Sequence, residues 1–211
     1  MIFIPPFDSL RLHTTLKPMS ELLRKQFQKR IQLSDAEFRR VLSFFVPRKI
    51  KRRQFLLQEG EVCKHIAYVT SGCLRQYTVD SKGEEHIIQF AIEDWWISDL
   101  HSFLTGKPAT DNIDALEDSE LLLLGREARD QLLESVPKLE RYFRLLQEAN
   151  YVSTHRRINE ALSASAEERY LTFLKTYPAL VERVPQSQIA SYLGITPQSL
   201  SRIRKELSEK K

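Results

Sequence analysis

The sequence has little cysteine and no long apolar run, and each of these absences excludes a class of protein. Cys63 and Cys73 are the only thiols among 211 residues. Two thiols are too few for a disulfide framework, or for a zinc or iron–sulfur site with four cysteine ligands. We interpret both as buried, unpaired cysteines. No apolar segment reaches the roughly 20 residues that a membrane-spanning helix needs, so we expect no membrane partner.

Residues 1–12 also lack the features of a secretory signal. They have no basic start, and Pro5 and Pro6 interrupt the apolar stretch. The sequence therefore predicts a cytoplasmic protein. Met19 stands directly before Ser20, where we expect a helix to begin, so the sequence is as compatible with a translation start at Met19 as with one at Met1.

Charged side chains are present in ordinary amount but are unevenly distributed. They make up 28% of the chain, and the net charge is +4. Residues 11–54 carry thirteen basic and three acidic side chains, whereas residues 80–134 carry four basic and fourteen acidic ones. This asymmetry argues against nucleic-acid binding by the whole surface, so any DNA contact should be local. We interpret the basic run at residues 48–53 as a solvated strand or loop edge.

Two kinds of periodicity follow one another along the chain. Ser34-Asp-Ala-Glu37 has the spacing of a capping box and predicts a helix that continues to Pro47. Between residues 55 and 124, short β-type runs alternate with turn signals such as Asp80-Ser-Lys-Gly83, which predicts a sandwich or barrel. Helical periodicity returns after Pro137.

These patterns predict an α+β protein in three parts. Residues 1–135 form N-terminal helices and a jelly-roll-like β-domain, residues 136–161 form a long helix, and residues 162–211 form a helical C-terminal domain. The small and polar segment at residues 162–166 is the predicted hinge, and Ser165 caps the helix that follows.

The long helix carries a nearly continuous stripe that must pack against something. Two interpretations are open: the stripe packs on the chain's own core, or it pairs with a second copy as a dimer helix. The residues of this stripe are Leu139, Tyr142, Phe143, Leu146, Ala149, Asn150 and Ser153.

The last 26 residues contain a helix-turn-helix pattern. A helix from Gln186 to Leu193 is followed by Gly194, at the position where a left-handed C-terminal residue belongs. Thr196 then has the position of an N-cap and Pro197 that of the first residue of a second helix. Ile189, Ala190 and Leu193 would face Leu200, Ile203 and Leu207 across the turn. Any wing should precede this unit, within residues 180–184.

The apolar positions leave one polar face on the second helix. Gln can bond adenine and Arg can bond guanine through two hydrogen bonds, while Thr and Lys suit phosphates beside the groove. One helix reads few base pairs, so we expect a homodimer on a palindromic site in double-stranded DNA. The predicted DNA-binding residues are Thr196, Gln198, Ser199, Ser201, Arg202 and Lys205.

The whole arrangement resembles the Crp/Fnr family of bacterial transcription regulators. In the β-domain, the resemblance is carried by Leu57, Gly60-Glu61, Tyr68-Val69, Gly72 and Leu74-Arg75. It implies a double-stranded β-helix (a β-roll), a long dimerisation helix and a winged-helix-like DNA-binding domain. It also implies a homodimer whose β-roll senses a small effector, with RNA polymerase as a candidate partner.

The sequence departs from the cyclic AMP-binding pattern of that family. Members that bind cyclic AMP carry Gly-Glu-Leu and, some ten residues later, an arginine that neutralises the phosphate. Ala109 stands at the arginine position here, so we do not expect cyclic AMP to bind in the usual way. The effector-pocket candidates are Ser98, Asp99, Leu100, Ala109 and Thr110; the effector is unknown, and no cofactor is expected.

Two other classes of function compete with this interpretation. A cupin-like metal enzyme would use His86, Asp99 and His101, but the paired-histidine spacing of cupins is absent, so no metal site and no catalytic residue are expected. A β-roll that only binds other proteins is the second alternative. Trp95, Trp96 and Phe103 could line a ligand site, although aromatic residues in such a domain are more often core.

Overall fold

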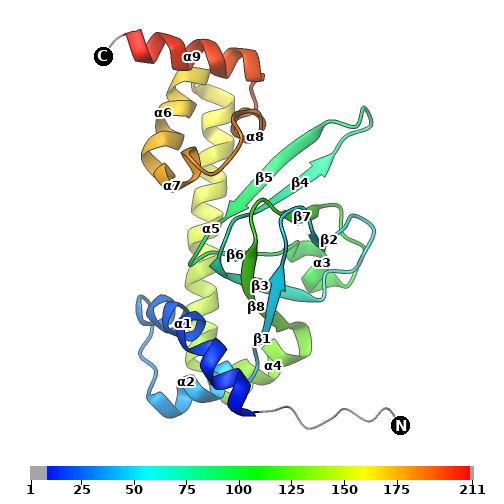
Figure 1. The fold of residues 1–211 in the computed structure, drawn as a ribbon, viewed down its shortest axis with the longest axis vertical. Coiled ribbons are helices and arrows are strands. Elements are labelled where there is room, and N and C mark those ends of the chain that lie inside the picture. The colour runs from blue at the N-terminus through cyan, green and yellow to red at the C-terminus, as the bar shows by residue number, and fades with distance from the viewer. Residues whose placement is uncertain (1–8, 210–211) are drawn as a thin grey trace.

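The computed structural model describes residues 9–209, with side chains from residue 19 onward. A helical pair leads into an eight-stranded β-domain, a long helix follows, and a small helical domain ends the chain (Figure 1). The N-terminal helices are α1 (Ser9–Gln28) and α2 (Asp35–Leu42). The capping box predicted at Ser34 is confirmed, because its side chain accepts from the Glu37 N–H and the Glu37 carboxylate accepts from the Ser34 N–H.

Two helix limits differ from the prediction. Helix α1 begins at Ser9 rather than at Ser20, and Pro18 lies within it. An interior proline costs a hydrogen bond but need not end a helix, so Pro18 does not mark the helix start. Helix α2 ends at Leu42, and Pro47 belongs to the strand that follows. That strand lies at a sheet edge, where a missing N–H is tolerated.

The β-domain consists of two four-stranded antiparallel sheets, which confirms the predicted β-roll within an α+β fold. One sheet has the order β1-β8-β3-β6 and the other β2-β7-β4-β5. The strands are β1 (Val46–Ile50), β2 (Phe55–Leu57), β3 (His65–Ser71), β4 (Leu74–Val79), β5 (Glu85–Ala91), β6 (Trp96–Ile97), β7 (Asn112–Ala115) and β8 (Ser119–Gly125), with α3 (Leu100–Thr105) between β6 and β7.

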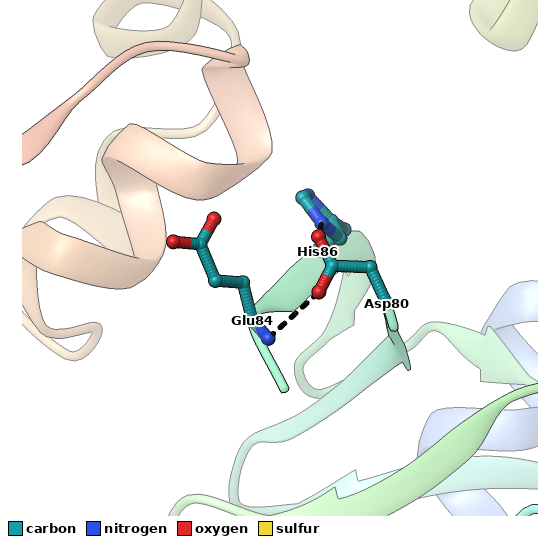
Figure 2. A group of neighbouring side chains, drawn as sticks. All are labelled: Asp80, Glu84 and His86. Atoms are coloured by element: carbon teal, nitrogen blue, oxygen red, sulfur yellow. Dashed lines mark hydrogen bonds and ion pairs between the residues drawn. The ribbon is translucent and has the colours of Figure 1, made fainter. Parts of the chain in front are cut away.

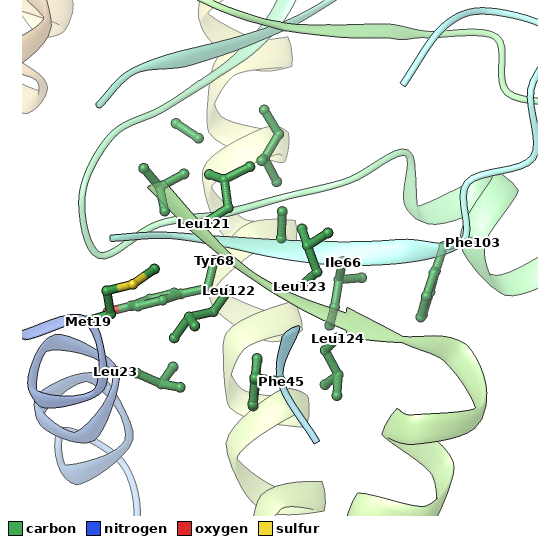
Figure 3. Packing of buried hydrophobic residues seen from close by; sticks show 14 of the residues in the cluster. Met19, Leu23, Phe45, Ile66, Tyr68, Phe103, Leu121, Leu122, Leu123 and Leu124 are labelled. Atoms are coloured by element: carbon green, nitrogen blue, oxygen red, sulfur yellow. The ribbon is translucent and has the colours of Figure 1, made fainter. Parts of the chain in front are cut away.

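The main core lies around β8 and β3, which are neighbours inside the first sheet. Residues 121–124 are four consecutive leucines, and all four are buried. A continuous apolar run of this kind fits a strand that is covered on both faces. Figure 3 shows Met19 and Leu23 of α1 on the side of Tyr68 and Leu122, so α1 covers the sheet on that side.

Helix α4 (Arg126–Ser135) leads into the long helix α5 (Lys138–Ser163), which runs along the molecule from the N-terminal helices to the C-terminal domain (Figure 1). The C-terminal domain contains α6 (Ala166–Thr176), α7 (Pro178–Val181), α8 (Gln186–Leu193) and α9 (Pro197–Glu209). The break between α5 and α6 falls in the predicted hinge, and Ser165 caps α6 through a second capping box. The prediction of a wing within residues 180–184 is wrong, because α7 and a turn occupy this segment and the described C-terminal residues contain no strand.

The C-terminal domain packs directly on the β-roll. A second core cluster joins Cys73, Tyr77, Ile87 and Phe90 of the β-roll to apolar residues of α6 through α9. At the edge of this cluster, the Ser191 hydroxyl donates to the Glu85 carbonyl oxygen (2.8 Å) and accepts from the Ile87 N–H (3.0 Å). The two domains therefore share a continuous apolar interface. No helix in the described part of the chain combines the length and the apolarity needed to cross a membrane.

Candidate functional site

The helix-turn-helix unit has the geometry that the sequence predicts. Gly194 adopts φ +66°, a left-handed conformation that ends α8. The Ile195 N–H then donates to the Ala190 carbonyl oxygen at 3.0 Å, which closes the turn. Ile189 and Ala190 of α8 and Leu200 of α9 are buried together. The short turn and the small Ala190 side chain together let the second helix cross close to the first.

The start of α9 is capped by Thr196. Its hydroxyl oxygen accepts from the Ser199 N–H at 3.1 Å, and Pro197 is the first residue of the helix. Ser199 is half-buried, and its hydroxyl lies 2.8 Å from that of Thr196. The cap thus already engages Ser199, which makes it the least available of the six predicted DNA-binding residues.

The outer face of α9 is polar and open. Gln198, Ser201, Arg202 and Lys205 are exposed, as is Thr196 at the turn. Lys205 lies 3.9 Å from Glu209, a distance typical of a weak surface pair. Arg204, which the sequence analysis did not include, is also exposed; it adjoins the apolar position Ile203, and no periodic signal distinguishes it. In Figure 1, α9 lies at the end of the molecule farthest from α1 and α2.

Internal contacts hold two of the effector-pocket candidates, Asp99 and Ala109, in place. Asp99 is buried and caps α3, and its carboxylate accepts from the backbone N–H groups of Ser102 (2.8 Å) and Thr110 (3.3 Å). Ala109 is also buried, and its N–H and C=O bond to the backbone of Glu61 and Gly60. The N–H groups of Ser102, Ala109 and Thr110 are therefore already bonded within the chain. Leu100 is half-buried and packs on the main core, while Ser98 lines a cavity of about 350 Å³.

Arg75, a half-buried cation on β4, is already paired. Arg75 forms two hydrogen bonds with Asp114, at 2.8 and 3.0 Å, and an ion pair with Glu85. Burial opposes the charged form of Arg75, but the hydrogen bonds from its carboxylate partners outweigh it and raise the pKa. Because Arg75 is held by two carboxylates, it cannot replace the arginine that is missing at Ala109.

The structure does not bring together the three residues considered as metal ligands. Asp99 is buried under α3, His101 is exposed on α3, and His86 lies on the β4–β5 hairpin. His86 instead neighbours Asp80 and Glu84 (Figure 2), and the ligand atoms of these three lie within 4.8 Å of one another. The Asp80 carboxylate bonds His86 Nε2 at 2.9 Å and the N–H groups of Lys82 and Glu84, which lowers its pKa. This cluster shapes the hairpin turn, in which Gly83 has φ +83° as predicted.

The predicted dimer stripe faces mainly the chain itself. Leu139 and Tyr142 are completely buried in the main core, and Phe143 and Leu146 pack against it. Leu139 and Tyr142 thus pack on the chain's own core, one of the two interpretations left open by the sequence, while Phe143 and Leu146 are only partly buried. Ala149, Asn150 and Ser153 line a cavity between α5 and the neighbouring domains.

A different face of α5 is apolar and uncovered. Its residues are Tyr151 (70% exposed), Val152 (66%), Ile158 (52%) and Leu162 (82%). Side chains of this size are seldom left exposed together on a helix of a stable monomer. This exposed stripe is a surface that a partner could cover.

Comparison with known proteins agrees with this architecture. Residues 47–136 match the family model of the cyclic nucleotide-binding domain. The transcriptional activator protein Anr of Pseudomonas aeruginosa is 25% identical over 173 residues, which cover 74% of this chain and 68% of that protein. The fumarate and nitrate reduction regulatory protein of Vibrio cholerae is 25% identical over 167 residues, covering 73% and 65%. The chain thus spans about two thirds of the length of these relatives.

Solved structures show the same fold. FixK2 from Bradyrhizobium japonicum superposes with a TM-score of 0.67 at 18% identity and covers 79% of this chain and 85% of its own. The regulator CLP from Xanthomonas campestris, described as responsive to c-di-GMP, has a TM-score of 0.68 at 16% identity, covering 84% and 93%. Fold and site together define a β-roll protein with a C-terminal helix-turn-helix domain. In sequence and fold the chain is similar to regulators of the Crp/Fnr type, in agreement with the resemblance that its sequence shows.

Proposed function

We propose that this protein regulates transcription by binding a specific DNA sequence as a homodimer. The observation that carries the proposal is the open polar face of α9, held on a complete helix-turn-helix unit at one end of the molecule. Such a face supplies the amide and guanidinium donors that base edges in the major groove can accept. No enzymatic activity is included in the proposal, and the place of action is the cytoplasm.

The residues of α9 divide into two roles. Gln198 and Arg202 read base edges, because both are exposed and can form paired hydrogen bonds with adenine and guanine. Thr196, Lys205 and the neighbouring Arg204 contact phosphates and set the position of the helix. Ser201 adds a short donor beside the bases, while Ser199 chiefly caps the helix.

A second copy covers the exposed stripe of α5. Tyr151, Ile158 and Leu162 recur at steps of seven and four residues on one face of α5, and Val152 lies beside that face, so two such helices can pack along a two-fold axis. The same axis places two α9 helices on half-sites about 34 Å apart, which favours a palindromic operator. RNA polymerase is a further partner in the proposal, since regulators of this class act at promoters.

The β-roll does not bind cyclic AMP in the usual way. Ala109 offers no cation, and the Asp99 carboxylate occupies the Ser102 and Thr110 N–H groups. A cyclic phosphate placed here would meet a buried carboxylate rather than free donors, and this contact is repulsive.

The test is selection of duplex DNA from a random library by the purified protein, followed by binding assays on the selected site and on random DNA. We expect Arg202→Ala to weaken binding to the selected site by about 1 to 3 kcal/mol and to relax one base position, with little effect on random DNA. Arg40→Ala is the matched control, because Arg40 is an exposed arginine on α2.

Two results would contradict the proposal. Equal losses on selected and random DNA would assign Arg202 to the backbone rather than to a base. Absence of binding at every salt concentration would favour a protein-docking role instead, because phosphate contacts make affinity fall steeply as salt is added.

A further inference from the structure

A cavity lies where three parts of the chain meet. It has a volume of about 370 Å³ and is bounded by α1, strands β5 and β6, α5 and the C-terminal domain. This volume is within the range of small-molecule sites, which occur preferentially between domains. The cavity is separate from the five effector-pocket candidates, none of which lines it.

The walls of the cavity are aromatic and held in place. Trp95 packs edge-on against Tyr177 of the C-terminal domain, with ring centroids 5.6 Å apart. Trp96 donates its indole N–H to the Tyr142 hydroxyl at 2.9 Å, and Tyr192 completes the wall on the α8 side. These contacts fix the rings before any ligand arrives, so a flat molecule could stack there at low entropic cost.

One buried acceptor in the wall has no partner. Gln26 is only 7% exposed, and its Nε2 donates to the Asp94 carbonyl oxygen at 3.0 Å. Its Oε1 is buried and, within the described part of the chain, receives no hydrogen bond. Buried polar atoms are nearly always paired, so an unpaired acceptor on a side chain that lines the cavity is one that a small shift of this side chain would offer to a donor on a ligand.

Two arginines in the lining have no carboxylate partner among the described residues. Arg30 lies over the Tyr142 ring at 5.8 Å, and Arg157 lies over the Tyr192 ring at 4.8 Å and donates to the Ile88 carbonyl oxygen. Asp94 also lines the cavity, but Lys29 and the Tyr68 hydroxyl already bind its carboxylate. The charge that remains available to a ligand is positive, and it suits an anion.

We propose that this cavity binds a small aromatic anion: a flat ring that stacks on Trp95 or Tyr192, a carboxylate that pairs with Arg30 or Arg157, and a donor that reaches Gln26 Oε1. That the ligand is the effector of this regulator rests on the proposed function. Tyr177, Leu180 and Tyr192 of the C-terminal domain line the same cavity. A bound ligand therefore favours the orientation in which these residues meet the β-roll, and it changes DNA affinity by its preference for that orientation.

The binding test uses the two tryptophans as reporters. They are the only ones in the chain and both line the cavity, so the two indole N–H signals in a ¹H–¹⁵N spectrum report occupancy. The probe is 1-naphthoate, with uncharged 1-naphthalenemethanol and non-aromatic cyclohexanecarboxylate as matched controls. We expect 1-naphthoate to shift both signals saturably, and each control to bind at least tenfold more weakly.

Variants then distinguish a specific binding site from nonspecific association. Arg30→Gln should weaken naphthoate binding about tenfold or more, whereas Arg40→Gln, which removes an exposed arginine outside the cavity, should leave it unchanged. Gln26→Leu should weaken only ligands that carry a donor, tested with 6-hydroxy-2-naphthoate, whose hydroxyl cannot bond its own carboxylate, against 2-naphthoate. The proposal is overturned if the shifts do not saturate below about 10 mM, or if Arg30→Gln and Arg40→Gln behave alike.

A second assay examines the effector role separately. Affinity for the selected DNA site is measured with and without saturating 1-naphthoate. A change of several-fold, absent in Arg30→Gln, supports the effector role, whereas binding without any change in DNA affinity overturns it. Because the first assay contains no DNA, failure of ligand binding and failure of DNA binding are distinguishable.

Discussion

Asp99 is the residue on which the proposal that this β-roll does not bind cyclic AMP in the usual way most depends. The sequence places Asp99 among the effector-pocket candidates. In the structure its carboxylate caps α3 and bonds the N–H of Thr110, so it acts as an internal anion. The sequence could show the missing arginine at Ala109, but the direction of the Asp99 side chain depends on how α3 packs under the loop.

This position yields a prediction about ligand binding. We expect titration calorimetry with cyclic AMP to give no saturable heat for the native protein or for Ala109→Arg. The new cation would neutralise Asp99 rather than open the Ser102 and Thr110 donors. Saturable binding by Ala109→Arg alone would mean that the missing arginine is the only obstacle, and saturable binding by the native protein would refute the argument about the pocket.

Among the elements, the contact between the C-terminal domain and the β-roll depends on Arg183. Its guanidinium forms two hydrogen bonds with Glu93 (2.7 and 3.1 Å) and two with Glu117 (2.7 and 3.0 Å). Burial raises the pKa of Glu93, but bonds from Arg183 and the Gly72 N–H lower it by more, so the net pKa lies below its ordinary value. At neutral pH the Glu93 carboxylate is therefore charged and available to hold the domain.

Thiol labelling can measure this docking contact. Cys73 lies in the interface cluster and burial raises its pKa to about 12, so we expect slow alkylation in the native protein. Arg183→Ala leaves two carboxylates without their cation and should speed labelling of Cys73 about tenfold, which corresponds to about 1.4 kcal/mol of docking free energy. Cys63, buried in the main core, is the internal reference. Equal acceleration of both thiols would indicate general unfolding instead.

The elements also show what local sequence can and cannot predict. The turn from α8 to α9 was predictable residue by residue, because Gly194, Thr196 and Pro197 each act through their own backbone conformation. The partner of the α5 stripe was not predictable, because a helical period identifies a stripe but not what packs against it. In the structure, Leu139 and Tyr142 are part of the main core of the chain itself. Likewise, Gln26 and Trp95 lie far apart in sequence, so the cavity that they share left no local signal.

For the whole molecule, the proposed function makes assembly into a dimer through the exposed stripe the property on which recognition of a palindromic site depends. We expect the double variant Val152→Asp/Leu162→Asp to sediment as a monomer, because two like charges would face their copies across the two-fold axis. Its affinity for a palindromic site should fall at least a hundredfold, while affinity for random DNA changes little.

Leu104→Asp is the control for this experiment, since Leu104 is 53% exposed but lies on α3, away from α5. It should remain dimeric and bind the site normally. A dimer that persists in the double variant would show that the copies associate through another surface.

Because the two domains share an apolar interface, neither the β-roll nor the C-terminal domain can be replaced by an unrelated domain without exposing apolar surface. The helix break at residues 164–165 looks like a convenient place to cut or to graft, yet a β-roll separated there would present Tyr77, Ile87 and Phe90 to water. A chimera that joins this β-roll to an unrelated DNA-binding domain would leave the same apolar surface uncovered. Productive recombination within such a protein would therefore have to carry the matching faces of β5 and α8 together.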